Sequence, residues 1–298
     1  MNILIRTDSS STIGTGHIMR DLVLASQYKY DTIIFATQNL PGNINHKIIE
    51  SNYQLSLLES NSISELNNLI KQYKINMLII DHYDIDYTLE MQLKNLNPHL
   101  TIMVLDDTYE KHYCDILLNH NISSDKKKYH TLVPHFCELR CGNQYTLLRD
   151  EFKKEKRKKK TKNSQIKILI AMGGADTAQL NIPILKILKN FTNISTTVVT
   201  TTANQELEKL KNYCKYKKWV NLQINTNHMA TLMAQSNFAI VTPSVTINEV
   251  YFMNLPFIAI KTASNQEDIY QFLHKKKFFT MKQFNTIKLK KYIKAFIS

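Results

Sequence analysis

Short apolar runs alternate with longer amphipathic stretches along the first half of the chain. Four of these runs are rich in Ile and Leu and predict strands, at residues 2–5, 32–36, 77–80 and 101–105. The stretches between them repeat apolar residues at helical spacing, so they predict helices that connect parallel strands. This alternation is typical of an α/β fold.

The same alternation restarts near residue 166. Further strands are predicted at residues 166–172, 196–200, 220–224, 238–242 and 256–260. Each half opens with a strand, a glycine-bearing turn and a helix, so we expect two Rossmann-like domains that face each other across a cleft. The predicted domains cover residues 1–152 and 166–298, with a basic linker over residues 153–165.

Composition and charge narrow the class of protein. The formal net charge is +13, but residues 153–162 hold eight Lys or Arg and one Glu, which leaves 30 basic and 24 acidic residues elsewhere. A basic run without interleaved aromatic residues is typical of a solvated linker, so we expect no nucleic-acid partner. No apolar run reaches about 18 residues and no signal peptide is evident, so we expect a cytoplasmic protein without a membrane partner. The oligomeric state stays open.

Polar residues follow three of the four strands in the first half. Asp8 follows the first, Asp81 the third, and Asp106-Asp107 the fourth. Loops beyond the carboxyl ends of parallel strands line the ligand crevice, so these residues are candidates for a site. Asp106 and Asp107 can position water or substrate, or simply cap their loop.

The segment Asp81-His82-Tyr83-Asp84-Ile85-Asp86 crowds three carboxylates and a histidine together. It matches neither a calcium loop nor a zinc spacing, so we expect no metal. Tyr83 can hydrogen-bond a sugar hydroxyl or an N-acyl group. The alternative is an ordinary tyrosine at the rim of the site.

The sharpest feature is the polar loop from Arg6 to Arg20, which contains Gly14, Gly16 and His17. The two glycines let the backbone approach a ligand, and the start of the following helix favours negative charge. The loop lacks the third glycine of a dinucleotide fingerprint and the Lys of a phosphate loop, so neither NAD nor ATP is indicated. His17 is either a base that accepts a proton near neutral pH or a packing residue.

In the second half, Thr242 to Glu249 follows a strand and opens a helix. Hydroxyls and free backbone N–H groups at such a point can bind a diphosphate, and Glu249 can accept hydrogen bonds from a ribose. The alternative is an ordinary helix start, with Ser244 or Thr246 as N-cap and Glu249 completing a capping box.

Several stretches resemble one enzyme family, the PseG-type hydrolases of pseudaminic acid synthesis, which release UDP from UDP-2,4-diacetamido-2,4,6-trideoxy-β-L-altropyranose. The resemblance extends over most of the chain and is carried by DSSSTIGTGHIMRDLVLA, IIDHYDID, VLDDTYEKHYCDILLNHN, CGNQYTLLRDEF, IAMGGADTAQLN and TPSVTINEVYF. It implies the two-domain GT-B fold of UDP-sugar transferases such as MurG, with water in place of the acceptor alcohol, and no metal or cofactor.

The resemblance also implies roles for residues. His17 would be the catalytic base. The sugar or nucleotide would be contacted by Asp8, Gly14, Gly16, Tyr83, Asn181 and Asn265. UDP would be bound by Gly173, Gly174, Ser244, Val245, Thr246 and Glu249, with Asp176 in the same glycine loop. Many related enzymes have glycine where this chain has Pro243, which removes one N–H donor.

The expected reaction is hydrolysis of the sugar C–O bond with inversion, which supplies the free sugar for pseudaminic acid and flagellin glycosylation. A UDP-sugar-dependent glycosyltransferase is the alternative, and a nucleic-acid binder ranks third.

Overall fold

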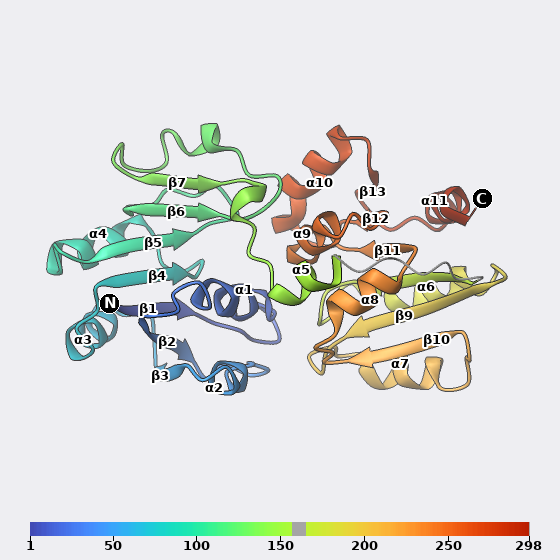
Figure 1. The fold of residues 1–298 in the computed structure, drawn as a ribbon, viewed down its shortest axis with the longest axis horizontal. Helices are drawn as coiled ribbons and strands as arrows, with labels where there is room; N and C mark the ends of the chain where they lie inside the picture. Colours follow the sequence, from blue (N-terminus) through green and yellow to red (C-terminus); the bar gives the residue numbers. More distant parts are fainter. Residues whose placement is uncertain (157–164, 298) are drawn as a thin grey trace. The chain divides into compact units, whose positions relative to one another are not determined.

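The computed structural model describes residues 1–156 and 165–297, and the chain divides into two compact units, Met1–Leu147 and Leu148–Ser298 (Figure 1). Within residues 1–147, seven strands form one parallel sheet in the order β3-β2-β1-β4-β5-β6-β7. The strands are β1 (Asn2–Thr7), β2 (Thr32–Gln38), β3 (Gln54–Leu58), β4 (Met77–Asp81), β5 (Thr101–Leu105), β6 (Ile116–Asn119) and β7 (Glu138–Cys141). The order reverses between β1 and β4, so their carboxyl ends form the point where such sheets bind ligands.

Helices cover both faces of this sheet. They are α1 (Gly16–Ala25), α2 (His46–Glu50), α3 (Ile63–Gln72) and α4 (Tyr87–Leu96), with short 3₁₀ turns η1 (Lys126–Tyr129) and η2 (Asn143–Tyr145). One core cluster joins α3 and α4 to the sheet through Leu66, Ile70 and Leu93. A second joins α1 and α2 to the other face through Ile18 and Ile48. The buried strands therefore lie between two helical layers, as parallel sheets require.

The second unit repeats this plan. In the described residues 165–297, six strands form a parallel sheet in the order β10-β9-β8-β11-β12-β13. The strands are β8 (Ile166–Ala171), β9 (Ile194–Thr200), β10 (Val220–Ile224), β11 (Phe238–Val241), β12 (Phe257–Ile260) and β13 (Phe279–Met281). The helices are α5 (Asp150–Lys156), α6 (Asn181–Leu188), α7 (Leu207–Cys214), α8 (Met229–Gln235), α9 (Val245–Phe252), α10 (Glu267–Lys275) and α11 (Thr286–Ile297), with a 3₁₀ turn η3 (Ser264–Gln266). Here the order reverses between β8 and β11.

The predicted α/β fold with two Rossmann-like domains is confirmed, and every predicted strand overlaps an observed one. Pattern reading missed β3, β6, β7 and β13. These strands are three to five residues long. In addition, β3, β7 and β13 lie at the edges of their sheets, where a strand is less buried and its sequence is less continuously apolar.

The sequence predicted a first domain ending at residue 152, whereas the structure divides the chain between Leu147 and Leu148. The difference arises from α5, which packs against α8 of the second unit. The hydroxyl of Thr231 in α8 also donates a hydrogen bond to Glu155 in α5, so α5 belongs to the second unit. Of the predicted basic linker 153–165, residues 157–164 lie outside the described residues.

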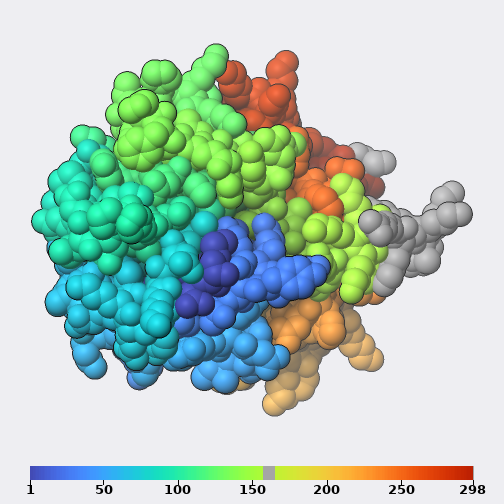
Figure 2. Space-filling model, turned by 60° about the vertical axis from the view of Figure 1, so that its left-hand side comes forward, coloured from blue at the N-terminus to red at the C-terminus, as the bar shows by residue number. Residues whose placement is uncertain are grey.

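The start of the chain, dark blue in Figure 2, lies at the surface of the first unit. There the terminal amino group pairs with Asp31 at 2.6 Å. No helix in the described part of the chain is long and apolar enough to cross a membrane.

Candidate active site

The loop after β1 brings His17 to the switch point of the first sheet. Gly14 has a φ of +88°, a conformation that suits glycine, and it exchanges two backbone hydrogen bonds with Ser10. These bonds close the loop, after which α1 begins at Gly16. His17 therefore lies in the first turn of α1, as the sequence predicted, and it is 8% exposed.

The imidazole of His17 is oriented by Asp81, the last residue of β4. Nδ1 lies 2.8 Å from Oδ1 of Asp81 and 3.2 Å from Nη2 of Arg20. An ionised carboxylate can only accept, so the shorter contact assigns the proton to Nδ1, which donates to Asp81. Nε2 has no hydrogen-bond partner among the residues that the structure describes. This arrangement leaves an unprotonated nitrogen free to accept a proton, which is the geometry of a general base.

Arg20 holds the same carboxylate from one helical turn further along α1. Its Nε donates to Oδ2 of Asp81 at 2.6 Å, and its Nη1 donates to Oδ2 of Asp107 at 2.8 Å. Although burial opposes ionisation, the positive charge of Arg20 holds the pKa of both Asp81 and Asp107 below the usual range. Both carboxylates are therefore ionised at neutral pH.

Asp21 is also fully buried in this region. Burial, together with the negative charge of Asp81, raises the pKa of Asp21 well above its usual range. Asp21 therefore keeps its proton at neutral pH and adds no third negative charge beside Asp81 and Asp107. Two ionised carboxylates face one guanidinium, so the surroundings of His17 carry an excess of negative charge.

Tyr83 stands beside His17. The two rings meet edge to face with centroids 5.0 Å apart, and the Tyr83 hydroxyl donates to Oδ1 of Asp107 at 3.0 Å. Burial and the charge of Asp107 raise the pKa of Tyr83, so the hydroxyl keeps its proton. Tyr83 is 51% exposed, which leaves one side of the ring open for a ligand.

The two remaining aspartates at strand ends, Asp8 and Asp106, accept hydrogen bonds from other residues of the protein. Asp8 is 1% exposed and accepts hydrogen bonds from Arg6, the backbone N–H of Gln38 and His82. Asp106 accepts from Thr108, from two further backbone N–H groups and from a tyrosine hydroxyl. Asp106 therefore caps its loop, one of the two roles expected for it. Substrate contact by Asp8 stays a prediction.

In the second unit, the loop after β8 is drawn close to β9. Gly173 has a φ of +83°, and a Cβ on Gly174 would lie 2.9 Å from Cγ2 of Thr201, so both positions require glycine. Asp176 follows and accepts from the backbone N–H groups of Leu180 and Asn181. The N-terminus of α6 is thus already occupied by a carboxylate.

The N-terminus of α9 is different. Its N-cap Ser244 uses its hydroxyl on Thr242 and its N–H on the carbonyl of that residue. The backbone N–H groups of Val245 and Thr246 have no partner in the described ranges 1–156 and 165–297. Of the two phosphate positions considered, α9 is therefore the one with free donors.

The expected alternative of a capping box at this helix is wrong. Ser244 is the N-cap but makes no side-chain capping bond, and Glu249 lies in the second turn. There Glu249 forms an ion pair with Arg149 at 3.4 Å, while Arg149 also pairs with Glu151 at 2.6 Å. Burial raises the pKa of Glu249 to about 7, against the opposing charge of Arg149. Glu249 is therefore poised to change charge near neutral pH.

Asn181 and Asn265, the two asparagines expected to contact the ligand, differ in burial. Asn181 is 1% exposed at the start of α6, and neither atom of its side-chain amide has a hydrogen-bond partner among the described residues. Asn265 lies exposed in η3, next to Gln266, whose side chain binds the backbone of Thr262. Asn181 thus offers a buried, unused amide, and Asn265 a surface one.

Sequence reasoning missed three charged or polar residues here: Arg20, Arg149 and His120. Arg20 lies three positions after His17, a spacing that puts both on one helix face and was available as a signal. His120 is 1% exposed with no partner for either ring nitrogen in the described chain, and burial together with Arg20 lowers its pKa to about 3. No local pattern marks His120 or Arg149.

Comparisons with known proteins show the family of this chain. The chain matches no protein-family model. It is 40% identical over 276 residues to the UDP-2,4-diacetamido-2,4,6-trideoxy-β-L-altropyranose hydrolase of Campylobacter jejuni, covering 93% of this chain and 97% of that enzyme. This chain belongs to that hydrolase family. The chain is therefore an enzyme of a family that hydrolyses a UDP-sugar.

Solved structures agree on the fold of this hydrolase family member. The spinosyn rhamnosyltransferase SpnG superposes with a TM-score of 0.71 at 11% identity, over 100% of this chain and 92% of that one. MurG of Acinetobacter baumannii gives 0.65 at 12% identity, over 100% and 91%. At such identities the likeness shows the two-domain GT-B glycosyltransferase fold alone.

Proposed function

We propose that this chain hydrolyses UDP-2,4-diacetamido-2,4,6-trideoxy-β-L-altropyranose to UDP and the free sugar. The family relationship supports the substrate. The observation that carries the reaction type is the His17–Asp81 pair, in which Nδ1 is committed to a carboxylate and Nε2 is free. A base of this kind activates water, which is what hydrolysis needs.

In the proposed reaction, a water molecule gives one proton to Nε2 of His17 while its oxygen attacks the anomeric carbon. A new C–O bond forms on one face as the bond between that carbon and the β-phosphate oxygen breaks on the other. The electron pair leaves with UDP, and the anomeric configuration inverts. UDP is a good leaving group, so the base is the main catalytic residue.

The charges around His17 suit this step. Sugar C–O cleavage passes through a transition state with positive charge at the anomeric carbon. The two ionised carboxylates, Asp81 and Asp107, outnumber the single guanidinium of Arg20. Their excess negative charge stabilises both this developing cation and the proton taken up by His17.

For UDP we propose the second switch point. The free N–H groups of Val245 and Thr246 and the Ser244 hydroxyl would bind the diphosphate, and Glu249 would accept hydrogen bonds from the ribose. Gly173 and Gly174 would let the backbone lie against the nucleotide. Asn181 would contact the nucleotide with its unused amide, and Asn265 would contact the sugar.

The biological setting is a finer proposal. The released sugar would feed pseudaminic acid synthesis for flagellin glycosylation, in the cytoplasm. The sequence resemblance supports this setting.

A panel of UDP-sugars tests the function, with UDP release measured in water alone. We expect release from the diacetamido-trideoxy sugar and little from UDP-N-acetylglucosamine. Release that depends on an added acceptor alcohol would instead favour the glycosyltransferase. Hydrolysis in oxygen-18 water should label the sugar, and label on UDP would reject C–O cleavage.

A further inference from the structure

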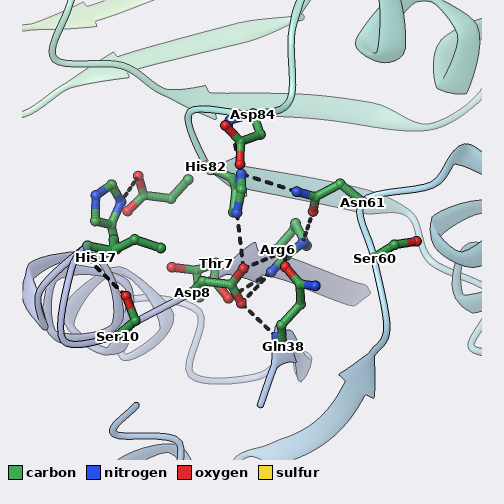
Figure 3. A network of polar contacts seen from close by, with 12 residues as sticks. Arg6, Thr7, Asp8, Ser10, His17, Gln38, Ser60, Asn61, His82 and Asp84 are labelled. Atoms are coloured by element: carbon green, nitrogen blue, oxygen red, sulfur yellow. Dashed lines mark hydrogen bonds and ion pairs between the residues drawn. The ribbon is translucent and has the colours of Figure 1, made fainter. Parts of the chain in front are cut away.

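Two histidine–aspartate hydrogen bonds link the segments at the carboxyl ends of β1 and β4. His17, which follows β1, bonds Asp81 at the end of β4 at 2.8 Å. In return His82, directly after β4, bonds Asp8, directly after β1, at 3.0 Å. Figure 3 shows His82 above Asp8 and Arg6, with His17 to one side. The two pairs consist of the same residue types, but they differ in whether the second ring nitrogen of the histidine has a hydrogen-bond partner.

His82 is used at both ring nitrogens. Nε2 faces the carboxylate of Asp8, and Nδ1 receives the backbone N–H of Asp84 at 3.1 Å (Figure 3). A backbone N–H can only donate, so Nδ1 is the acceptor and the proton sits on Nε2. Both ring nitrogens of His82 are therefore engaged, so it has no nitrogen free for catalysis.

Asp8 anchors His82 firmly. Arg6 donates to both carboxylate oxygens, at 2.8 and 2.6 Å, and the N–H of Gln38 donates at 2.6 Å. Although burial opposes ionisation, the hydrogen bonds from His82 and Arg6 hold the pKa of Asp8 well below its usual range. Arg6 and Asp8 are both almost fully buried, so the pair is a rigid part of the unit.

The residue enclosed by these contacts is Tyr83. His82 bonds the N–H of Asp84, and the carbonyl of His82 accepts from Ile85 at 3.3 Å, so the backbone on both sides of Tyr83 is fixed. The half-exposed ring then reaches His17 edge to face and Asp107 through its hydroxyl. The turn thus fixes the backbone from which the Tyr83 ring reaches these two partners.

We propose that His82 is a positioning residue for hydrolysis: anchored by Asp8, it fixes the turn that holds Tyr83 against His17. The proposal rests on the proposed function of His17. It gives Asp8 a role through His82 instead of through direct contact with the substrate.

Two substitutions separate the two bonds of His82. In His82→Gln the side-chain amide reaches as far as Nε2 and keeps a donor for Asp8, but the acceptor for the Asp84 N–H is lost. In His82→Asn the side-chain oxygen stands near Nδ1 and keeps that acceptor, but Asp8 loses a donor. We expect H82Q to lower kcat on the order of tenfold with UDP affinity unchanged, because Tyr83 is then no longer held against the base His17. We expect H82N to lower Tm and to lower kcat less than H82Q does, since the bond that closes the turn is retained and only its anchor on Asp8 is lost.

A double-mutant cycle with Tyr83→Ala decides whether His82 acts through Tyr83. In the Y83A background we expect H82Q to change kcat less than about twofold. An equal effect in both backgrounds, or a loss of Tm without a loss of kcat in H82Q, would overturn the proposal. Nitrogen-15 NMR of the parent protein adds a test that needs no variant: the proton of His82 must reside on Nε2, and an Nδ1–H form would also overturn it.

The parent enzyme and His17→Ala are assayed alongside. Absence of UDP release by the parent, or full activity of H17A, would reject the proposed function itself. Normal parent activity, an inactive H17A and an additive cycle would reject only the role of His82.

Discussion

The two units share a strand order at the switch point but differ in the chemistry they place there. After β1 and β4, the side chains are charged and already paired, with Asp81 and Asp107 bound to Arg20. After β8 and β11, the first turn of α9 and the amide of Asn181 keep donors that no described residue occupies. The paired network fixes the orientation of one imidazole, whereas the unpaired donors are available to hydrogen-bond a ligand. The same sheet topology therefore determines where a site lies and leaves its chemistry to a few loop residues.

The sharpest test of this contrast removes the base. His17→Ala should lower kcat by roughly 10²- to 10⁴-fold, because no group then takes the proton from water. UDP affinity, measured by calorimetry, should stay within about twofold of the parent, since the proposed UDP groups lie in the other unit. A large loss of UDP affinity would mean that the two units do not divide the work in this way.

A smaller loss is expected when the base remains but its orientation is disturbed. Asp81→Asn keeps the shape of the side chain and removes its charge, so Nδ1 of His17 loses its charged acceptor and Arg20 loses one of its two carboxylate partners. We expect kcat to fall roughly 10- to 100-fold, as is typical of residues that orient a catalytic group. Asp106→Asn is the matched control, because Asp106 caps a neighbouring loop, and it should leave kcat nearly unchanged while lowering Tm.

The proposed UDP site of the second unit is tested by a substitution at Glu249. At pH 8, where Glu249 is mostly ionised, Glu249→Gln replaces a charged acceptor with a neutral one of the same shape, so UDP affinity should fall about tenfold. The value of kcat at saturating substrate should change little. Glu151→Gln is a suitable control, because Glu151 also pairs with Arg149 but is not assigned to the ribose. Unchanged UDP affinity in E249Q would refute the ribose assignment.

The smallest effect is a dependence of UDP affinity on pH. Burial raises the pKa of Glu249 to about 7, so the free protein carries mostly neutral Glu249 at pH 6 and mostly ionised Glu249 at pH 8. Ribose hydroxyls donate to the ionised form, so binding should strengthen as pH rises, by at most about tenfold over this range. UDP itself titrates here, so the quantity to compare is the difference between the parent and E249Q. Parallel pH curves for the two proteins would contradict the assignment.

Much of the fold follows from local patterns. Apolar runs such as residues 77–80 predict strands because a strand buried on both faces needs continuous apolar residues. The strands β6 and β13 were not predicted because each has few consecutive apolar residues: β6 has three, and β13 is three residues long with a threonine in the middle. The candidate base was also predictable, since a histidine beside a glycine turn after the first strand is a local feature.

The partners of these residues were not predictable. Asp81 meets His17 across 64 residues of chain, and Arg149 meets Glu249 across 100. Asp8, Asp81 and Asp106 follow their strands in the same way, yet one anchors His82, one orients His17 and one caps a loop. The sequence by itself determined the strands, the glycine turns and the presence of a histidine at the first switch point, because these depend on near neighbours. Only the tertiary structure decided which carboxylate is paired and which nitrogen is free, because hydrogen bonds and burial depend on residues brought together from distant strands.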